Sequence, residues 1–423
     1  MSQATRILLA LIAGLLAGIA GAALAPSLAL RATSFAQPVG TAWLNALQMT
    51  IIPLVVALLV TGIAATAEAA RASRLASRAI VLFLVLLWIS SALGALLTLG
   101  LLDLFPLPQH AGDALRASFA GAKPVEGLPS FADFIAAMVP TNVVGAAATD
   151  AFLPLILFTT VFAFAVTRLP EHQRSVLTGF FQALADAMLV MINWVLWLAP
   201  VGVFALAYVV GAKAGTSSLA ALAHYVAIVS ATGAVVWLLA VPFAVIGGRV
   251  PLGKLLRALG PVQAVGISTQ SSLASLPAML VATERLGVPV ATSGVVLPLA
   301  VAIFRVTGPV MNLAVAIYVA HVFGIHPGPG AIAAGIAVAA TTTLGAVSLP
   351  GAISYVSSIA PIAMAMGVPV EPLALLVAVE TLPDLVRTLG NVTMDVAVTT
   401  VLSERVGDPA PRSEADTLLE ATA

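Results

Sequence analysis

The sequence predicts an all-α polytopic membrane protein with about eight transmembrane helices and two re-entrant helical hairpins. Three observations predict this class. Hydrophobic residues make up 61% of the 423 positions and charged residues only 9%, which is typical of proteins that live in a bilayer. Apolar runs long enough to cross a membrane recur along the chain. Two further apolar runs are interrupted at their centres by hydroxyl-bearing residues, glycine and proline.

The expected spans follow one another from the N-terminus. A perpendicular helix needs about 20 apolar residues to cross, and longer runs are tilted or extend beyond the bilayer. The first span, residues 7–24, follows Arg6 and is expected to stay uncleaved, because a signal-peptide core would be shorter. The remaining spans are expected near residues 38–66, 76–102, 146–167, 176–212, 219–247, 290–322 and 371–402.

Basic residues gather in alternate loops. They lie between the second and third spans, between the fourth and fifth, and after the sixth: Arg71, Arg74, Arg78, Arg168, Arg174, Arg249, Lys254 and Arg257. The positive-inside rule therefore predicts a multi-pass protein of the cell (inner or plasma) membrane with both termini in the cytoplasm. The polar segment 103–133 would be an external loop, and residues 407–423 a short cytoplasmic tail.

Residues 258–288 and 331–366 do not fit as simple spans. Each has a helix-breaking, hydroxyl-rich centre with apolar arms of about ten to fifteen residues, which are too short to cross. Unwound backbone at membrane depth is tolerated only where it is buried in protein or lines a cavity, so we expect two hairpins whose tips meet at a site. Each hairpin is followed by a span. This repeated arrangement favours an inverted-repeat transporter with its site near mid-membrane.

A polar stripe follows one face of the last span. Glu380, Asp384, Arg387, Asn391 and Asp395 fall at i, i+4, i+7, i+11 and i+15, so at about 100° per residue they share a sector roughly 80° wide. An ionisable group at membrane depth costs at least about 2.5 kcal/mol and needs a partner, water or a solute. A guanidinium suits a carboxylate, and a carboxylate one turn away suits an ammonium. The alternative is a purely structural network of buried salt bridges, in which Glu380 and Asp384 pair with Arg387.

Three motifs together resemble the glutamate transporter-like dicarboxylate/amino acid:cation symporter family. Residues 271–277 (SSLASLP) are similar to the family's first hairpin tip, residues 347–352 (VSLPGA) to its second, and residues 384–395 (DLVRTLGNVTMD) to its last-helix signature. Weaker similarity is found at residues 139–142 (VPTN) and 199–205 (APVGVFA). The resemblance covers nearly the whole chain.

The resemblance implies a homotrimer of elevator transporters, with a static scaffold in residues 1–75 and 103–212 and a moving transport domain in 76–102 and 213–406. It implies that Arg387 grips the substrate's side-chain carboxylate and Asp384 its ammonium, and that Asn391 and Asp395 help to hold sodium. The implied substrate-binding residues are Ser271, Ser272, Leu349, Pro350, Gly351, Asp384, Arg387, Thr388 and Asn391, with the α-carboxylate at backbone groups of Ser272 and the 349–351 tip.

The chain departs from the family in the seventh span. Where the family carries NMDGT, this chain has FRVTG at residues 304–308, so both cation-binding side chains are missing and a permanent cation, Arg305, is present. Leu273 also replaces a usual serine. We expect reduced or absent sodium coupling. Protons carried by Glu380 or Asp395, facilitated transport, and a reduced sodium site at Asn391 and Asp395 remain alternatives, as does a purely structural Arg305 that neutralises Asp395 or Glu380.

Chemistry of other kinds is not expected from this sequence. It contains no nucleophile–base pair, metal-ligand cluster, phosphate loop or nucleotide motif, so an enzyme is not expected. The formal net charge of zero gives no argument for nucleic acid. Three functions are compatible with the motifs: a transporter of an acidic amino acid, a C4-dicarboxylate transporter, and a non-transporting sensor or channel. Asp384 distinguishes the first two, because dicarboxylate members of the family typically have serine there.

Overall fold

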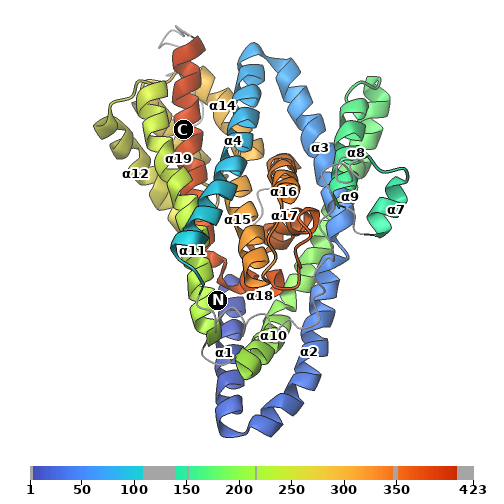
Figure 1. Ribbon diagram of the computed structural model, residues 1–423. Coiled ribbons are helices and arrows are strands. Elements are labelled where there is room, and N and C mark those ends of the chain that lie inside the picture. The colour runs from blue at the N-terminus through green and yellow to red at the C-terminus, as the bar shows by residue number, and fades with distance from the viewer. Residues whose placement is uncertain (1–2, 108–138, 150–151, 215–216, 346–350, 407–423) are drawn as a thin grey trace.

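The part of the chain that the structure describes is built of helices. This computed structural model describes residues 3–107, 139–149, 152–214, 217–345 and 351–406, and every regular element in these ranges is helical (Figure 1). The all-α prediction is thus confirmed. Six helical stretches in the same ranges are long and apolar enough to cross a membrane: Arg6–Leu24, Pro26–Glu68, Arg74–Leu104, Glu171–Trp197, Leu219–Gly247 and Val290–Val322.

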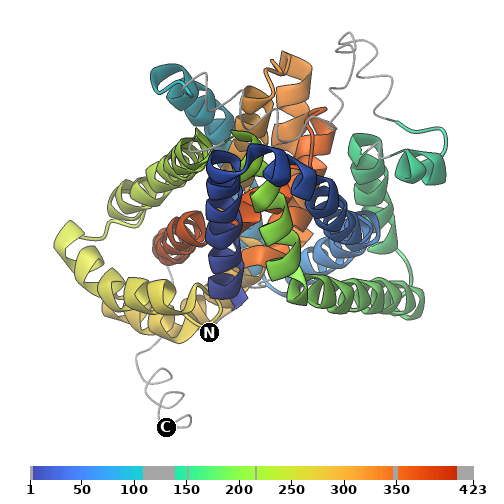
Figure 2. The same ribbon diagram turned by 90° about the horizontal axis from the view of Figure 1, so that it is seen from below.

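Helix α1 (Gln3–Leu24) packs along α10 (Ala199–Ala214) through glycines. Gly14 and Gly18 form a G-x-x-x-G pair, and a Cβ on Gly18 would lie 2.3 Å from the carbonyl oxygen of Tyr208. On α10, a Cβ on Gly211 would lie 2.4 Å from the carbonyl oxygen of Leu15. Figure 2 shows the two helices side by side. Small residues therefore let these backbones touch, as is common between membrane helices.

Helix α2 (Pro26–Gln48) also packs on α10, and α3 (Ile51–Ala72) continues in the direction of α2 and packs on α8 (Phe152–Val166) and α9 (Glu171–Trp197). A short helix, α7 (Val143–Ala148), precedes α8. The predicted span 176–212 is two helices, α9 and α10, so its prediction as one helix is wrong. Pro200 explains the break, because it has no N–H to donate to the carbonyl of Leu196.

A second group of helices surrounds the polar stripe. Helix α11 (Ser217–Pro242), extended by the π-helical turn η1 (Phe243–Gly247), packs most extensively on α19 (Thr381–Val406). Helix α4 (Arg74–Leu104) packs mainly on α15 (Thr307–Val322). The C-terminal end of α19 and the turn between α3 and α4 lie at the same end of the molecule (Figure 1).

Two further predicted spans are interrupted at prolines. The span 290–322 consists of α14 (Val290–Ile303) and α15, with a break at residues 304–306, because Pro309 cannot donate to the carbonyl of Arg305. The span 371–402 consists of α18 (Leu373–Leu376), the 3₁₀ turn η3 (Val377–Val379) and α19. Pro383 likewise cannot donate to the carbonyl of Val379. Glu380 therefore precedes α19, and the other four residues of the stripe lie within it.

Both predicted hairpins contain paired helices. Helices α12 (Leu252–Thr269) and α13 (Leu276–Arg285) pack against each other across a turn that begins at Gln270, whose φ is 50°. Helix α16 (Pro329–Thr342), with the 3₁₀ turn η2 (Thr343–Gly345), packs against α17 (Gly351–Ala365). Leu349 and Pro350 of the second tip, most of the predicted external loop and the tail 407–423 lie outside the described residues, and Gly351 begins α17.

The glycine contact between α1 and α10 gives a prediction about stability. Gly18→Ala should destabilise the protein by about 1–3 kcal/mol, because its new methyl group overlaps the Tyr208 carbonyl and the helices must separate. Gly100→Ala on α4 is the matched control, since a Cβ there meets nothing within 4 Å. Thermal unfolding of the purified protein in detergent measures both. Equal melting temperatures for the two variants would contradict the close packing.

Candidate functional site

Three buried charges meet where α19 begins. Nη1 of Arg387 donates to Oε1 of Glu380 and to Oδ1 of Asp384, the latter at 3.1 Å. Glu380 is 2% exposed and Asp384 is 8% exposed. Removing one partner of such a group leaves an uncompensated buried charge, which costs about 3–5 kcal/mol. The structure thus brings these three predicted site residues into direct contact.

The guanidinium of Arg387 keeps one edge directed away from these acids. Nη2 lies 3.5 Å from Oδ1 of Asn312 on α15, and Nε is buried with no hydrogen-bond partner among the described residues. Nε and Nη2 together form the side-on edge with which arginine binds a carboxylate through two parallel hydrogen bonds. The two internal acids occupy Nη1 instead. Nε is therefore the atom of this edge that lacks a partner, and a carboxylate that reached the edge could bind it through two parallel hydrogen bonds.

Two buried tyrosines lie next to Glu380, on the side of the carboxylate oxygen that does not bind Nη1 of Arg387: Tyr225 contacts Glu380, and Tyr355 contacts Tyr225. The hydroxyl of Tyr225 on α11 lies 3.5 Å from Oε2 of Glu380 and 2.9 Å from the hydroxyl of Tyr355 on α17. Neither tyrosine was identified from the sequence, and Asn312 was missed as well. One feature of the sequence could have identified these three residues: each places a polar side-chain atom inside an otherwise apolar helix, and such an atom needs a partner at membrane depth.

The break between α14 and α15 is tied to α19 through Asn391. The backbone N–H of Thr307 donates to Oδ1 of Asn391 at 3.1 Å, and the Thr307 hydroxyl lies 2.7 Å from the same oxygen and 2.8 Å from the carbonyl oxygen of Arg387. A carbonyl oxygen has two lone pairs, so the Thr307 N–H and hydroxyl together can fill them. The side-chain oxygen of Asn391, a residue that the resemblance assigns to sodium, thus already has a donor within the chain, the Thr307 N–H.

Asp395 is the other acid of the stripe, and Arg305 at the break between α14 and α15 is the cation to be considered with it. Asp395 is 1% exposed, and neither of its carboxylate oxygens has a hydrogen-bond partner among the described residues. The guanidinium of Arg305 attracts this carboxylate and that of Asp384, and it is repelled by Arg387. A charge buried in this way depends strongly on a nearby opposite charge. Among the described residues, no three histidine or acidic side chains gather so as to hold a metal ion.

The first hairpin lies beside the middle of α19. A Cβ on Gly266 of α12 would lie 3.6 Å from Cγ2 of Thr388 and 3.8 Å from Oγ of Ser275. The Ser271 side chain accepts from the backbone N–H of Ala274 at 3.2 Å, a bond inside the hairpin turn. The hairpin therefore reaches Thr388. The roles assigned to Ser271 and Ser272 remain predictions.

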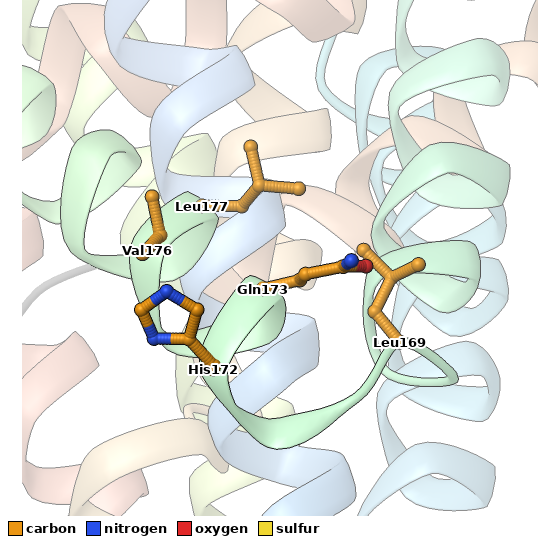
Figure 3. A pocket seen from close by; sticks show the side chains of 5 residues that line it. All are labelled: Leu169, His172, Gln173, Val176 and Leu177. Atoms are coloured by element: carbon orange, nitrogen blue, oxygen red, sulfur yellow. The ribbon is translucent and has the colours of Figure 1, made fainter.

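Two hollows elsewhere do not contain the charged residues. A mostly apolar groove of about 440 Å³ lies between α4 and α11, and Val306 and Met394 line its inner part. A hollow of about 360 Å³ lies at the turn between α8 and α9, on the other side of the molecule from α19 in Figure 1. Figure 3 shows its lining side chains, Leu169, His172, Gln173, Val176 and Leu177. Neither hollow offers paired charges for an ionic solute.

Long apolar helices around a buried charged site are typical of multi-pass membrane proteins. Residues 4–405 match the Sodium:dicarboxylate symporter family, and the chain belongs to this family. The resemblance identified from the hairpin and last-helix motifs is thereby confirmed, as is the expectation of a transporter instead of an enzyme.

Relatives cover most of the chain at moderate identity. A proton/sodium-glutamate symport protein of Bacillus caldotenax is 28% identical over an alignment of 390 residues that covers 89% of this chain and 89% of the relative. The proton/glutamate-aspartate symporter of Escherichia coli (strain K12) is 28% identical over 383 residues, 87% of this chain and 84% of the relative. A C4-dicarboxylate transport protein of Pseudomonas savastanoi pv. phaseolicola is 26% identical over 380 residues, 88% of this chain and 80% of the relative.

The open edge of Arg387 leads to a prediction about binding. Arg387→Ala should weaken the binding of an acidic solute, whether aspartate, glutamate or a C4-dicarboxylate, by at least about 100-fold, because both charge-assisted hydrogen bonds to a carboxylate are lost. Neutral amino acids should be affected less. Isothermal titration of the purified protein measures both affinities.

Two further variants complete this test. Arg387→Lys keeps a positive charge for Glu380 and Asp384 but loses the two-pronged edge, so it should fold while still binding aspartate more weakly than the parent. Arg257→Ala removes a solvent-exposed arginine of α12 and should bind normally. Parent-like aspartate affinity in folded Arg387→Ala protein would show that Arg387 does not bind the substrate.

Proposed function

We propose that the chain is a secondary active transporter of an acidic amino acid, aspartate or glutamate. The observation that carries this proposal is the Nε–Nη2 edge of Arg387: Nε is buried without a hydrogen-bond partner among the described residues, Asp384 binds Nη1 instead, and the edge matches the geometry of a carboxylate. Asp384 on the adjacent turn gives the ammonium group of the same solute a counter-charge. Relatives named as glutamate and aspartate symporters support this assignment.

A C4-dicarboxylate is the second candidate substrate, and one observation favours it. Asp384 already accepts a hydrogen bond from Arg387 at 3.1 Å, so it has a partner inside the chain and does not require an ammonium group. Asp384 thus distinguishes the two substrates less sharply than the sequence alone indicated. A relative named as a C4-dicarboxylate transport protein supports this candidate.

The mechanism we propose is an elevator movement within a homotrimer, in which residues 76–102 and 213–406 move against a scaffold of residues 1–75 and 103–212. The packing of helices supports this division. Helices α1, α2 and α10 pack on one another, and α3 packs on both α8 and α9, whereas α11, α12 and α14 pack on α19. Both termini face the cytoplasm in this proposal, and the two hairpins are re-entrant.

Coupling to sodium is reduced or absent in the proposed mechanism. Phe304 stacks on Phe83 with ring centroids 4.5 Å apart, and Val306 faces the apolar groove, so neither offers a side-chain oxygen to a hard cation. Thr307 occupies the side-chain oxygen of Asn391. Arg305 supplies a tethered positive charge that attracts Asp395. A tethered charge carries no ion gradient, so protons would drive transport through Glu380 or Asp395, or transport would be facilitated.

Uptake of labelled aspartate into proteoliposomes tests the proposed function. Uptake above that of protein-free liposomes, blocked by excess unlabelled aspartate, is expected. Stronger competition by succinate than by aspartate would favour the dicarboxylate candidate. Absence of uptake for aspartate, glutamate and succinate under sodium and proton gradients would contradict the proposal.

Asp384→Ser gives a prediction about selectivity. Removing the carboxylate should lower the affinity for aspartate by about tenfold or more, since a charge-assisted hydrogen bond to the ammonium group is lost. The affinity for succinate should fall much less or rise. Competition binding with both solutes measures the ratio of the two affinities. An unchanged ratio would show that Asp384 does not contact an ammonium group.

The break at residues 304–306 gives a prediction about coupling. Aspartate affinity of the parent protein should change little with sodium concentration at fixed pH and ionic strength. The triple variant Phe304→Asn, Arg305→Met, Val306→Asp restores cation-binding side chains, and its affinity should rise with sodium. Arg305→Met alone is the control, because it removes the tethered charge without adding oxygen ligands. A steep dependence on several sodium ions in the parent would contradict the proposal.

A further inference from the structure

The hydroxyl groups of Tyr225 and Tyr355 meet inside the apolar core. Tyr225 is 0% exposed and Tyr355 is 2% exposed, and their oxygens are 2.9 Å apart. A buried hydroxyl without a partner costs free energy, so a pair of them facing each other is a specific arrangement. The pair joins α11 to α17, the second arm of the second hairpin.

Glu380 sets the direction of the hydrogen bonds in this pair. When the Glu380 carboxylate is ionised against Arg387 it can only accept, and in that state Tyr225 donates to Oε2 of Glu380. The oxygen of Tyr225 then accepts from the hydroxyl of Tyr355. One oxygen of Glu380 thus faces the Tyr225 hydroxyl at 3.5 Å, a long hydrogen bond, and the other binds Arg387, so the two contacts together favour one orientation of the carboxylate.

The orientation of Glu380 determines which edge of Arg387 is open. Glu380 and Asp384 both bind Nη1, and this leaves Nε and Nη2 on the opposite side of the guanidinium. If Glu380 turned, it could bind the Nε–Nη2 edge itself and compete with a substrate for it. The tyrosine pair therefore acts on the binding edge without lying next to it.

We propose that Tyr225 and Tyr355 are positioning residues for the substrate carboxylate, because they hold Glu380 on Nη1 of Arg387 and so keep the Nε–Nη2 edge open. This inference rests on the proposed function of Arg387. On this proposal, α17 contributes to substrate affinity indirectly, because its Tyr355 binds Tyr225 and not the substrate. The hydroxyl groups, and not the rings, carry the effect.

A third tyrosine provides the matched control. Tyr318 on α15 is also 0% exposed, and its ring packs edge-on against Tyr225 with centroids 5.3 Å apart. Its hydroxyl donates to the carbonyl oxygen of Ala221 at 3.0 Å and lies 3.1 Å from Nδ1 of His224. Tyr318→Phe therefore removes a buried, hydrogen-bonded hydroxyl from the same core and leaves Glu380 untouched.

The test compares aspartate affinity and melting temperature among Tyr225→Phe, Tyr355→Phe and Tyr318→Phe in the purified full-length protein. The first two should bind aspartate about three- to tenfold more weakly, as expected for the loss of a hydrogen bond to a charged group. Tyr318→Phe should bind like the parent. Equal loss of affinity in all three would indicate a general effect of core hydroxyls and would overturn the inference.

The Arg387→Lys background separates positioning from folding. A lysine is a point charge without an edge to orient, so adding Tyr225→Phe there should change affinity less than it does in the parent. The same fold-loss in both backgrounds would overturn the inference. Parent-like binding by both tyrosine variants would overturn the inference alone, whereas absence of aspartate and succinate binding by the parent protein would overturn the proposed function and the inference with it.

Discussion

The ion cluster of Arg387 with Glu380 and Asp384 is the interaction on which the rest of this molecule depends. A guanidinium at membrane depth must be paired, and this one is paired with two acids that lie just before it in the chain. Because Pro383 cannot donate to the carbonyl of Val379, the helix is interrupted there, and Glu380 lies at the junction between η3 and α19. Helices α11, α15 and α17 then supply Tyr225, Asn312 and Tyr355 around the cluster.

The balance of buried charge connects this cluster to transport. Three carboxylates, Glu380, Asp384 and Asp395, face two guanidiniums, Arg387 and Arg305. An acidic amino acid adds a further net negative charge, so its binding is favoured when a proton or cation arrives with it. The tethered charge of Arg305 lowers that demand near Asp395.

Much of the fold and half of the site could be predicted from sequence, since both follow from local patterns. Apolar runs predicted the long helices, hydroxyl-rich interruptions predicted the paired hairpin helices, and the spacing of the stripe predicted that Asp384 and Arg387 face one way. The helix breaks at Pro200, Pro309 and Pro383 follow from the missing N–H of proline, but the apolar runs alone did not predict them. Tyr225, Tyr355 and Asn312 could not be assigned, because their partners lie 75 to 155 residues away in sequence.

The most direct test of this account is an experimental structure of the protein in lipid nanodiscs with bound aspartate. We predict that one carboxylate of the substrate lies within about 3.2 Å of both Nε and Nη2 of Arg387. Glu380 and Asp384 should remain on Nη1, and Tyr225 should remain on Glu380. A substrate carboxylate bound elsewhere, or a Glu380 side chain that occupies the Nε–Nη2 edge while aspartate is bound, would contradict the account.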